Sequence, residues 1–423
     1  MKLINSLTLR KGNGERPKTI KFFTLGCKAN QYDTQSIRER FLKRGFQETL
    51  PGKLADYFLI NTCTVTSGAD QKSRQIIRRC IQINPQAKII VTGCLAEHDW
   101  KLLANIPGID LIVKKSFFPE GVSSFSQHTR AFLKIQDGCS NFCTYCKVAL
   151  VRGKEKSKPL DQVLKEAQAL VANGYQEIVL TGICLGAYGR DFIKKIDLAD
   201  CYARLEEISG LKRIRLSSLE AGDISAKLLR HLAHSKKFCR HLHIPIQSGD
   251  NQILKSMNRK YTRKKYLSLI KRIKRQIPGI AITTDCLVGF PGEGDKNFKQ
   301  TLDLVGQIQP LKVHIFSYST RSGTRAEHFS GAVKPEVINI RCKELERLSQ
   351  ECAEKFKCKF IGAQLSILIE TRNKENPAYL TGLTDNYLKV NLPFKPGLRN
   401  KIVLVKLRQL VGDDFYAEYI DKK

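Results

Sequence analysis

Three cysteines close together in the chain carry the most specific chemical pattern. Cys139, Cys143 and Cys146 have the spacing C-x3-C-x2-C. Three thiolates on one loop can hold three irons of a [4Fe–4S] cluster, which leaves the fourth iron open to an exogenous ligand. An open position distinguishes a catalytic metal centre from a closed structural one. A zinc knuckle or three buried cysteines are the alternatives, but a knuckle needs a fourth ligand and the next cysteine is Cys184.

A second set of cysteines is scattered along the first hundred residues. Cys27, Cys63 and Cys94 each follow directly on an apolar, strand-like segment. The carboxyl ends of neighbouring parallel strands meet along one sheet edge, so thiols far apart in sequence can converge there. Asn30 and Asn61 are candidate hydrogen-bond donors beside them. Core packing explains any one such cysteine, but three at successive strand ends favour a second iron–sulfur site with one open iron.

The charge of the chain is unusual. Its 423 residues carry a net charge of +32, and an excess of this size indicates a polyanionic partner, most simply nucleic acid. A soluble basic protein without such a partner is the alternative.

Composition and hydropathy exclude several classes of protein. Hydrophobic residues make up 42%, which excludes a disordered or collagen-like chain. No apolar run approaches the ~20 residues that span a bilayer, and the N-terminus lacks the apolar core of a secretory signal. We therefore expect a cytoplasmic protein without membrane contact. In such a chain, 14 cysteines favour metal ligation or catalysis over disulfides.

The elements that must position these cysteines begin after a basic N-terminal arm at residues 1–18. Residues 19–115 alternate strands and helices, which predicts a parallel α/β domain covered on both faces. The strands are expected at 19–25, 56–60 and 88–92, and the helices at 33–44 and 71–84. A polar stretch then breaks the pattern, so residues 116–129 are expected to form a linker.

The rest of the chain predicts two further domains, about three in all for this length. Strand–helix units resume over residues 130–357 and predict a partial or full (β/α) barrel, with a doubly wound sheet as the alternative. Its six strands are expected at 131–135, 177–182, 213–218, 241–246, 281–289 and 312–319. Short strands separated by turns in residues 358–423 predict a small antiparallel β-barrel, an architecture that often holds oligonucleotides.

Longer motifs around the cysteines resemble the radical S-adenosylmethionine methylthiotransferases. The similarity covers residues 19–422 and includes the C-terminal barrel, which is similar to the family's RNA-contacting TRAM domain. It is carried by Gly-Cys-Lys-Ala-Asn-Gln-Tyr-Asp (26–33), Asn-Thr-Cys-Thr-Val-Thr (61–66), Gly-Cys-Leu-Ala (93–96), the 139–146 loop, His-Ile-Pro-Ile-Gln-Ser-Gly-Asp (243–250) and Gly-Phe-Pro-Gly-Glu (289–293).

The resemblance implies two [4Fe–4S] clusters and S-adenosyl-L-methionine as cofactors. The open iron of the first cluster would bind S-adenosylmethionine, and reduction would yield a radical that abstracts hydrogen from C2 of an adenine. The second cluster would present the sulfur of the methylthio group. The first cluster would be held by the catalytic Cys139, Cys143 and Cys146, and the second by Cys27, Cys63 and Cys94.

Three further residues are implied to line the S-adenosylmethionine pocket, namely Tyr145, Gly182 and Glu220. Glu220 could equally be an ordinary surface carboxylate.

The motifs are most similar to the branch acting on N6-threonylcarbamoyladenosine at position 37 of tRNA, and Lys28, Gln31 and Tyr32 carry that similarity. The expected protein is therefore a monomeric tRNA-modifying transferase that grips the anticodon loop. It would receive electrons from a donor such as flavodoxin or ferredoxin. Methylthiolation of isopentenyladenosine-37 or of a ribosomal-protein aspartate is the alternative reaction. A metal-stabilised RNA-binding protein is the non-enzymatic alternative.

Overall fold

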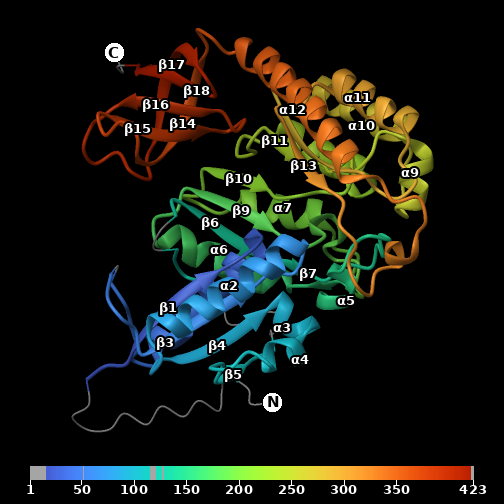
Figure 1. Cartoon of the computed structure of the whole chain (residues 1–423). Coiled ribbons are helices and arrows are strands. Elements are labelled where there is room, and N and C mark those ends of the chain that lie inside the picture. Colours follow the sequence, from blue (N-terminus) through green and yellow to red (C-terminus); the bar gives the residue numbers. More distant parts are fainter. Residues whose placement is uncertain (1–15, 51, 115–120, 126–127, 421–423) are drawn as a thin grey trace.

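A computed structural model describes residues 16–50, 52–114, 121–125 and 128–420 of the chain. Most of the predicted N-terminal arm, and residues 116–120 and 126–127 of the predicted linker, lie outside the described residues. Figure 1 shows a blue N-terminal sheet, a central group of strands and helices from green to orange, and a red C-terminal barrel. Within the described ranges, no helix combines the length and apolar character needed to cross a membrane.

The N-terminal sheet has five parallel strands, two more than the sequence predicts. Their order is β2 (Gln47–Glu48), β1 (Thr19–Thr24), β3 (Tyr57–Thr62), β4 (Lys88–Gly93) and β5 (Leu111–Ile112). The additional strands β2 and β5 are two-residue edges, too short for an apolar pattern. The predicted covering of both faces is confirmed, because α1 packs on one face and helices α2 to α4 on the other. These helices are α1 (Lys28–Lys43), α2 (Ser67–Ile83), α3 (Cys94–His98) and α4 (Trp100–Ala104).

Helix α1 begins earlier than its predicted start at residue 33. Cys27 is its N-cap residue, with an extended backbone, so the helix starts at Lys28. The missed turn contains Asn30, a polar residue that is nevertheless buried. Hydrophobic periodicity cannot find such a turn, because its burial depends on hydrogen bonds to the neighbouring domain.

The six predicted central strands are all present and run parallel. They form two sheets, β6 (Arg130–Lys134), β9 (Glu177–Thr181) and β10 (Arg213–Leu216), and β11 (His241–His243), β12 (Ala281–Val288) and β13 (Lys312–Ser317). Parallel bridges from Ile214 to Phe238 and from Ser218 to His243 join the sheets. The strands follow one another in chain order, as in a barrel and unlike a doubly wound sheet, where the order reverses. No pairing joins β13 to β6 among the described residues, so the barrel is partial.

Helices cover the outside of this barrel and bury its apolar face in one large core. The longest, α12 (Pro335–Cys358), leads from β13 toward the C-terminal barrel (Figure 1). The others are α5 (Val148–Arg152), α6 (Leu160–Ala172), α7 (Leu198–Glu206), α8 (Ala226–His234), α9 (Asn251–Ser256), α10 (Arg263–Gln276) and α11 (Asp295–Ile308). The short elements are the strand pair β7 (Gln136–Asp137) and β8 (Lys156–Ser157), and the 3-10 turns η2 (Leu185–Ala187), η3 (Ala221–Asp223) and η4 (Arg325–His328).

The C-terminal strands close into a five-stranded barrel, as the sequence predicts. Their order is β14 (Gln364–Arg372), β15 (Tyr379–Thr384), β16 (Lys389–Pro393), β18 (Asp414–Tyr419) and β17 (Ile402–Val411). The pairings are antiparallel as predicted, except that β16 and β18 pair in parallel. Arginines at the amino-terminal ends of the central strands hold this barrel. Arg213 donates to the Ser366 carbonyl at 2.6 Å, and Arg130 pairs with Glu370 at 2.7 Å. The C-terminal barrel therefore lies at the end of the central barrel opposite the cysteine loop.

A buried layer of charges joins the N-terminal domain to the central barrel. Lys134 on β6 pairs with Asp33 on α1, and also with Asp137 at 2.9 Å. Arg152 on α5 lies 2.7 Å from Asp137 and donates to the Asn30 side chain at 2.6 Å. Buried charges are tolerated only when they are paired and hydrogen-bonded. This layer therefore fixes α1 against the barrel.

Candidate active site

The Cys139 loop follows β6 and β7 at the carboxyl end of the central strands. Gly138 opens it with φ +74°, and a Cβ there would lie 1.9 Å from the Lys154 carbonyl oxygen, so only glycine fits. The Cys139 amide donates to the Gly153 carbonyl at 3.0 Å. The loop ends where α5 begins at Val148. These contacts bring the three thiols so close together that a negative charge on one raises the pKa of another.

Each thiol of this loop receives a hydrogen bond. The Val148 amide donates to Cys146 Sγ at 3.4 Å, and Arg259 Nη1 donates to Cys143 Sγ at 3.4 Å. Cys139 shares a side-chain hydrogen bond with Cys184, which lowers the pKa of Cys139. Donors aimed at sulfur are what thiolate ligands of iron–sulfur clusters require. The loop therefore fits such a cluster.

Cys184 is a site residue that the sequence analysis missed. Its thiol lies 3.6 Å from the Asn141 side-chain nitrogen and 3.5 Å from Asp223 Oδ2. Its amide donates to Gln136 at 2.8 Å. The separation of 38 residues from Cys146 hides this position, because β9 returns the chain to the same end of the barrel. The only signal available was its place just after a predicted strand.

The three residues predicted for the S-adenosylmethionine pocket lie around this loop. A Cβ at Gly182 would lie 2.9 Å from Gln136 Oε1, so close packing excludes a side chain there. The Tyr145 ring packs edge-on against Phe290. Glu220 is an ion-pair partner of Arg259, and burial raises the pKa of Glu220 despite this pairing. Glu220 is thus no ordinary surface carboxylate, although its contact with S-adenosylmethionine stays a prediction.

The scattered cysteines also converge. Cys27, Cys63 and Cys94 line one small pocket at the carboxyl edge of the N-terminal sheet, as expected from their positions after β1, β3 and β4. The opposite wall comes from α5, including Val148 and Val151. Since α5 starts two residues after Cys146, this single short helix separates the two cysteine sites.

Glycine and asparagine allow this convergence. Gly26 has φ +93°, and a Cβ there would lie 2.8 Å from Cys63 Sγ. Asn30 donates to the Leu25 carbonyl at 2.7 Å and the Thr62 carbonyl at 3.0 Å, so it links β1 to β3, and its Oδ1 lies 3.8 Å from Cys94 Sγ. Asn61 instead donates to the Asn30 carbonyl at 3.0 Å. Of the two predicted asparagines, Asn30 is the one whose side chain reaches a thiol.

A metal bound at either site would have to displace protons from buried thiols. Burial raises the pKa of Cys146 to about 12 and that of Cys63 to about 11, so both thiols keep their protons at neutral pH unless a metal displaces them. No disulfide joins cysteines among the described residues, which include all 14. All-sulfur donor sets of this kind suit iron–sulfur clusters or zinc.

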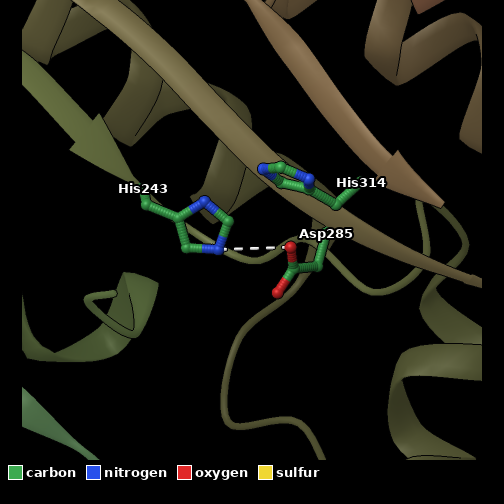
Figure 2. Close-up of side chains that lie close together, drawn as sticks. All are labelled: His243, Asp285 and His314. Carbon is green, nitrogen blue, oxygen red and sulfur yellow. Dashed lines mark ion pairs between the residues drawn. The ribbon is translucent and has the colours of Figure 1, made fainter. Parts of the chain in front are cut away.

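A third polar cluster lies on the inner face of strands β11 to β13. Figure 2 shows His243, Asp285 and His314 facing one another, with His243 Nε2 3.2 Å from Asp285 Oδ1. Two imidazoles and a carboxylate are a donor set that divalent transition metals accept, but here the carboxylate is already engaged by His243. Asp285 also lies close enough to Glu220 to contribute to the raised pKa of Glu220. The cluster therefore adjoins the predicted S-adenosylmethionine pocket.

An open cavity of about 1150 Å³ extends from this cluster along β13 and α12 to the C-terminal barrel. Lys28, at the start of α1, lines it together with His241 and Tyr387. Cys27, the residue before Lys28, lines the small pocket of the scattered cysteines. Consecutive residues of the chain therefore line the cavity and that pocket. The arrangement provides space for a substrate next to the strand-end cysteines.

Comparisons with known families agree with this geometry. Residues 133–305 match the Radical SAM superfamily, and residues 19–114 match a group described as Uncharacterized protein family UPF0004. The structure resembles that of the radical S-adenosylmethionine methyltransferase TsrM from Kitasatospora setae, with a TM-score of 0.53 and 13% identity over 74% of this chain and 77% of that chain. The partial barrel with its three-cysteine loop defines a radical S-adenosylmethionine enzyme.

Curated relatives show which family of radical S-adenosylmethionine enzymes the chain belongs to. The chain is 39% identical to the threonylcarbamoyladenosine tRNA methylthiotransferase MtaB of Bacillus subtilis (strain 168), over 92% of this chain and 93% of the relative. It is 32% identical to the tRNA-2-methylthio-N(6)-dimethylallyladenosine synthase of Desulfitobacterium hafniense (strain Y51), over 95% of this chain and 97% of the relative. The chain belongs to the radical S-adenosylmethionine tRNA methylthiotransferases, a family of transferases that use S-adenosylmethionine and [4Fe–4S] clusters.

Proposed function

We propose that this enzyme methylthiolates C2 of N6-threonylcarbamoyladenosine at position 37 of tRNA. The observation that carries the proposal is the placement of two three-cysteine sites on either side of α5, beside one open cavity. The 39% identity to a relative named for threonylcarbamoyladenosine supports the choice of substrate. The net charge of +32 suits the anticodon loop of a tRNA.

The residues have separate roles in this proposal. Cys139, Cys143 and Cys146 hold the catalytic cluster, and the scattered trio Cys27, Cys63 and Cys94 holds the auxiliary cluster. When bound, the two clusters and S-adenosylmethionine supply the one-electron chemistry and the sulfur that an unactivated C–H bond requires.

The polar side chains around the loop position the cofactor. Arg259 donates to the Cys143 sulfur and holds Glu220 in place. Glu220 thereby presents a fixed carboxylate to the amino group of S-adenosylmethionine. Tyr145 and Gly182 shape the same pocket, the first by its bulk and the second by its lack of a side chain.

The remaining partners are proposals of the same kind. We expect a monomer that receives electrons from flavodoxin or ferredoxin and acts in the cytoplasm. The C-terminal barrel would serve as a TRAM-like contact for RNA.

Nucleoside mass spectrometry tests the proposal. Expressed in a host that lacks its own methylthiotransferases, the wild-type chain is expected to convert threonylcarbamoyladenosine in tRNA to its 2-methylthio form. The variant Cys143→Ala is expected to leave that nucleoside unconverted.

Methylthiolation of dimethylallyladenosine instead would favour the alternative substrate, which the relative from Desulfitobacterium hafniense supports. The absence of any methylthiolated nucleoside would favour an RNA-binding protein without catalytic activity.

A further inference from the structure

One cation in the open cavity lacks an opposite charge. Lys28 lines the cavity beside His241 and Tyr387. Among the described residues, no side chain or backbone group forms a hydrogen bond or an ion pair with its ammonium group. A half-buried ammonium without a partner has lost hydration that nothing in the protein replaces.

Two arginines near Lys28 are already matched. Arg130 pairs with Glu370 and Arg215 with Glu177, each at 2.7 Å. Both guanidinium groups also lie against the Tyr387 ring, at 5.9 and 5.0 Å from its centroid.

Two of the acidic residues that line the cavity already have partners. Asp413 pairs with Lys357 at 2.5 Å and Asp414 with Lys389 at 2.6 Å, and Glu346 and Glu354 lie on α12. The part of the cavity around Lys28 therefore has an unmatched positive charge.

A hydrogen-bond chain places an acceptor beside this charge. Asp285 holds the Nε2 proton of His243 at 3.2 Å (Figure 2). When the Thr283 hydroxyl donates to His243 Nδ1 at 2.9 Å, the same hydroxyl accepts from His241 Nε2 at 2.9 Å. His241 Nδ1 then carries a lone pair, and it has no partner among the described residues.

We propose that this part of the cavity is a carboxylate subsite that reads the substituent on N6 of the target adenosine. The Lys28 ammonium binds the carboxylate of the threonyl group, and His241 Nδ1 accepts a hydrogen bond from the hydroxyl or an N–H group of the same substituent. The inference rests on the proposed function and adds the residues that select the substrate.

The subsite also explains how the enzyme would distinguish threonylcarbamoyladenosine from dimethylallyladenosine, the substrates that appear in the names of the two relatives. A dimethylallyl group has no charge and no hydrogen-bonding atom, so its binding here would bury Lys28 and His241 Nδ1 without partners. Sites built for polar groups reject analogues that lack them. Because Lys28 follows Cys27 directly, a carboxylate bound here keeps the substituent next to the sulfur pocket.

Binding of anticodon stem-loop RNAs to the anaerobically purified holoenzyme tests the subsite. The probes are identical RNAs that carry at position 37 either adenosine, its threonylcarbamoyl derivative or the glycylcarbamoyl analogue, which keeps the carboxylate and lacks the hydroxyl. The wild-type enzyme is expected to bind both derivatives roughly tenfold more tightly than plain adenosine, as an ionic hydrogen bond provides.

Lys28→Gln is expected to lose this preference, and Lys28→Arg to keep it. Lys271→Gln, at an exposed position on α10, serves as the matched control and should behave as the wild type. Lys28 follows Cys27, a predicted cluster ligand, so its replacement can also disturb the cluster. The preference is a ratio of two RNA affinities measured on the same preparation. A general weakening of RNA binding by a lost cluster therefore cancels.

Lys28→Gln with an unchanged preference would overturn the inference, as would a glycylcarbamoyl RNA that binds no better than plain adenosine. Failure of the proposed function has a different signature. In that case the wild-type enzyme itself would leave the threonylcarbamoyl RNA unconverted and convert a dimethylallyl RNA.

Discussion

The two cysteine sites reach the same number of thiols by different routes. One is a single loop, where Cys139, Cys143 and Cys146 lie within eight residues and α5 follows at once. The other collects Cys27, Cys63 and Cys94 from the ends of three neighbouring parallel strands. The loop site depends on local spacing, whereas the strand-end site depends on the register of a whole sheet.

Their surroundings differ as well. The loop site contains the ion pair of Arg259 with Glu220, a fixed charge pattern suited to a zwitterionic ligand. The strand-end site contains the Asn30 amide, the apolar wall of α5 and two cations, Lys147 and Arg152. We propose that the loop site binds the amino acid part of the cofactor and that the strand-end site holds and presents sulfur.

Removal of one strand-end thiol would separate the two sites most clearly. Cys63→Ala is expected to abolish the methylthiolated nucleoside while the enzyme still cleaves S-adenosylmethionine to 5′-deoxyadenosine, because the loop site is untouched. Chromatography of the deoxyadenosine and mass spectrometry of the RNA measure the two outcomes. Cys80→Ala, a packing cysteine on α2, should retain both activities. If Cys63→Ala retained the loop cluster and yet failed to cleave S-adenosylmethionine, the proposed separation of functions between the two sites would be contradicted.

The charge layer that holds the two sites together gives the second largest effect. Lys134→Met leaves Asp33 and Asp137 without the ammonium that lies between them. Breaking a buried pair in this way costs about 3–5 kcal/mol of the free energy of unfolding, to be measured by chemical denaturation. The control Arg347→Met breaks the exposed pair with Glu351 and should cost about 1 kcal/mol or less. Equal effects would mean that the layer does not join the domains.

A smaller effect tests the charge pattern of the loop site. Glu220→Gln is expected to weaken S-adenosylmethionine binding roughly tenfold, the value of one ionic hydrogen bond, without changing the iron content. Isothermal titration of the reconstituted enzyme measures this affinity. Glu344→Gln, at an exposed position on α12, is the control. An unchanged affinity in Glu220→Gln would remove this carboxylate from the pocket.

The smallest expected effect concerns the thiol next to the loop. Cys184→Ala should leave the iron content unchanged, because three cysteines suffice and Cys184 contributes hydrogen bonds to the loop site. Iron analysis and the visible spectrum measure this. If the variant lost about half its iron, Cys184 would be a fourth ligand, and the loop site would be closed rather than open.

The sequence predicts the parts of this enzyme that depend on local pattern or on strand order. All six central strands and the closing C-terminal barrel were predicted from alternation and turns. The convergence of Cys27, Cys63 and Cys94 follows from parallel strands alone. Cys184, and the His243–Asp285 pair with its link to His241, could not be predicted, because side chains from strands far apart in sequence meet there on one inner face. The start of α1 at Lys28 could not be predicted from hydrophobic periodicity, because the buried residue Asn30 in its first turn is polar.

Iron analysis of two triple variants tests the central claim most directly. The wild-type enzyme is expected to bind about eight irons and eight sulfides, as two [4Fe–4S] clusters require. Replacement of Cys139, Cys143 and Cys146 by alanine should leave about four irons, and so should the same replacement of Cys27, Cys63 and Cys94. Either triple variant with an unchanged iron content, or a wild-type enzyme that binds zinc and no iron, would contradict the account.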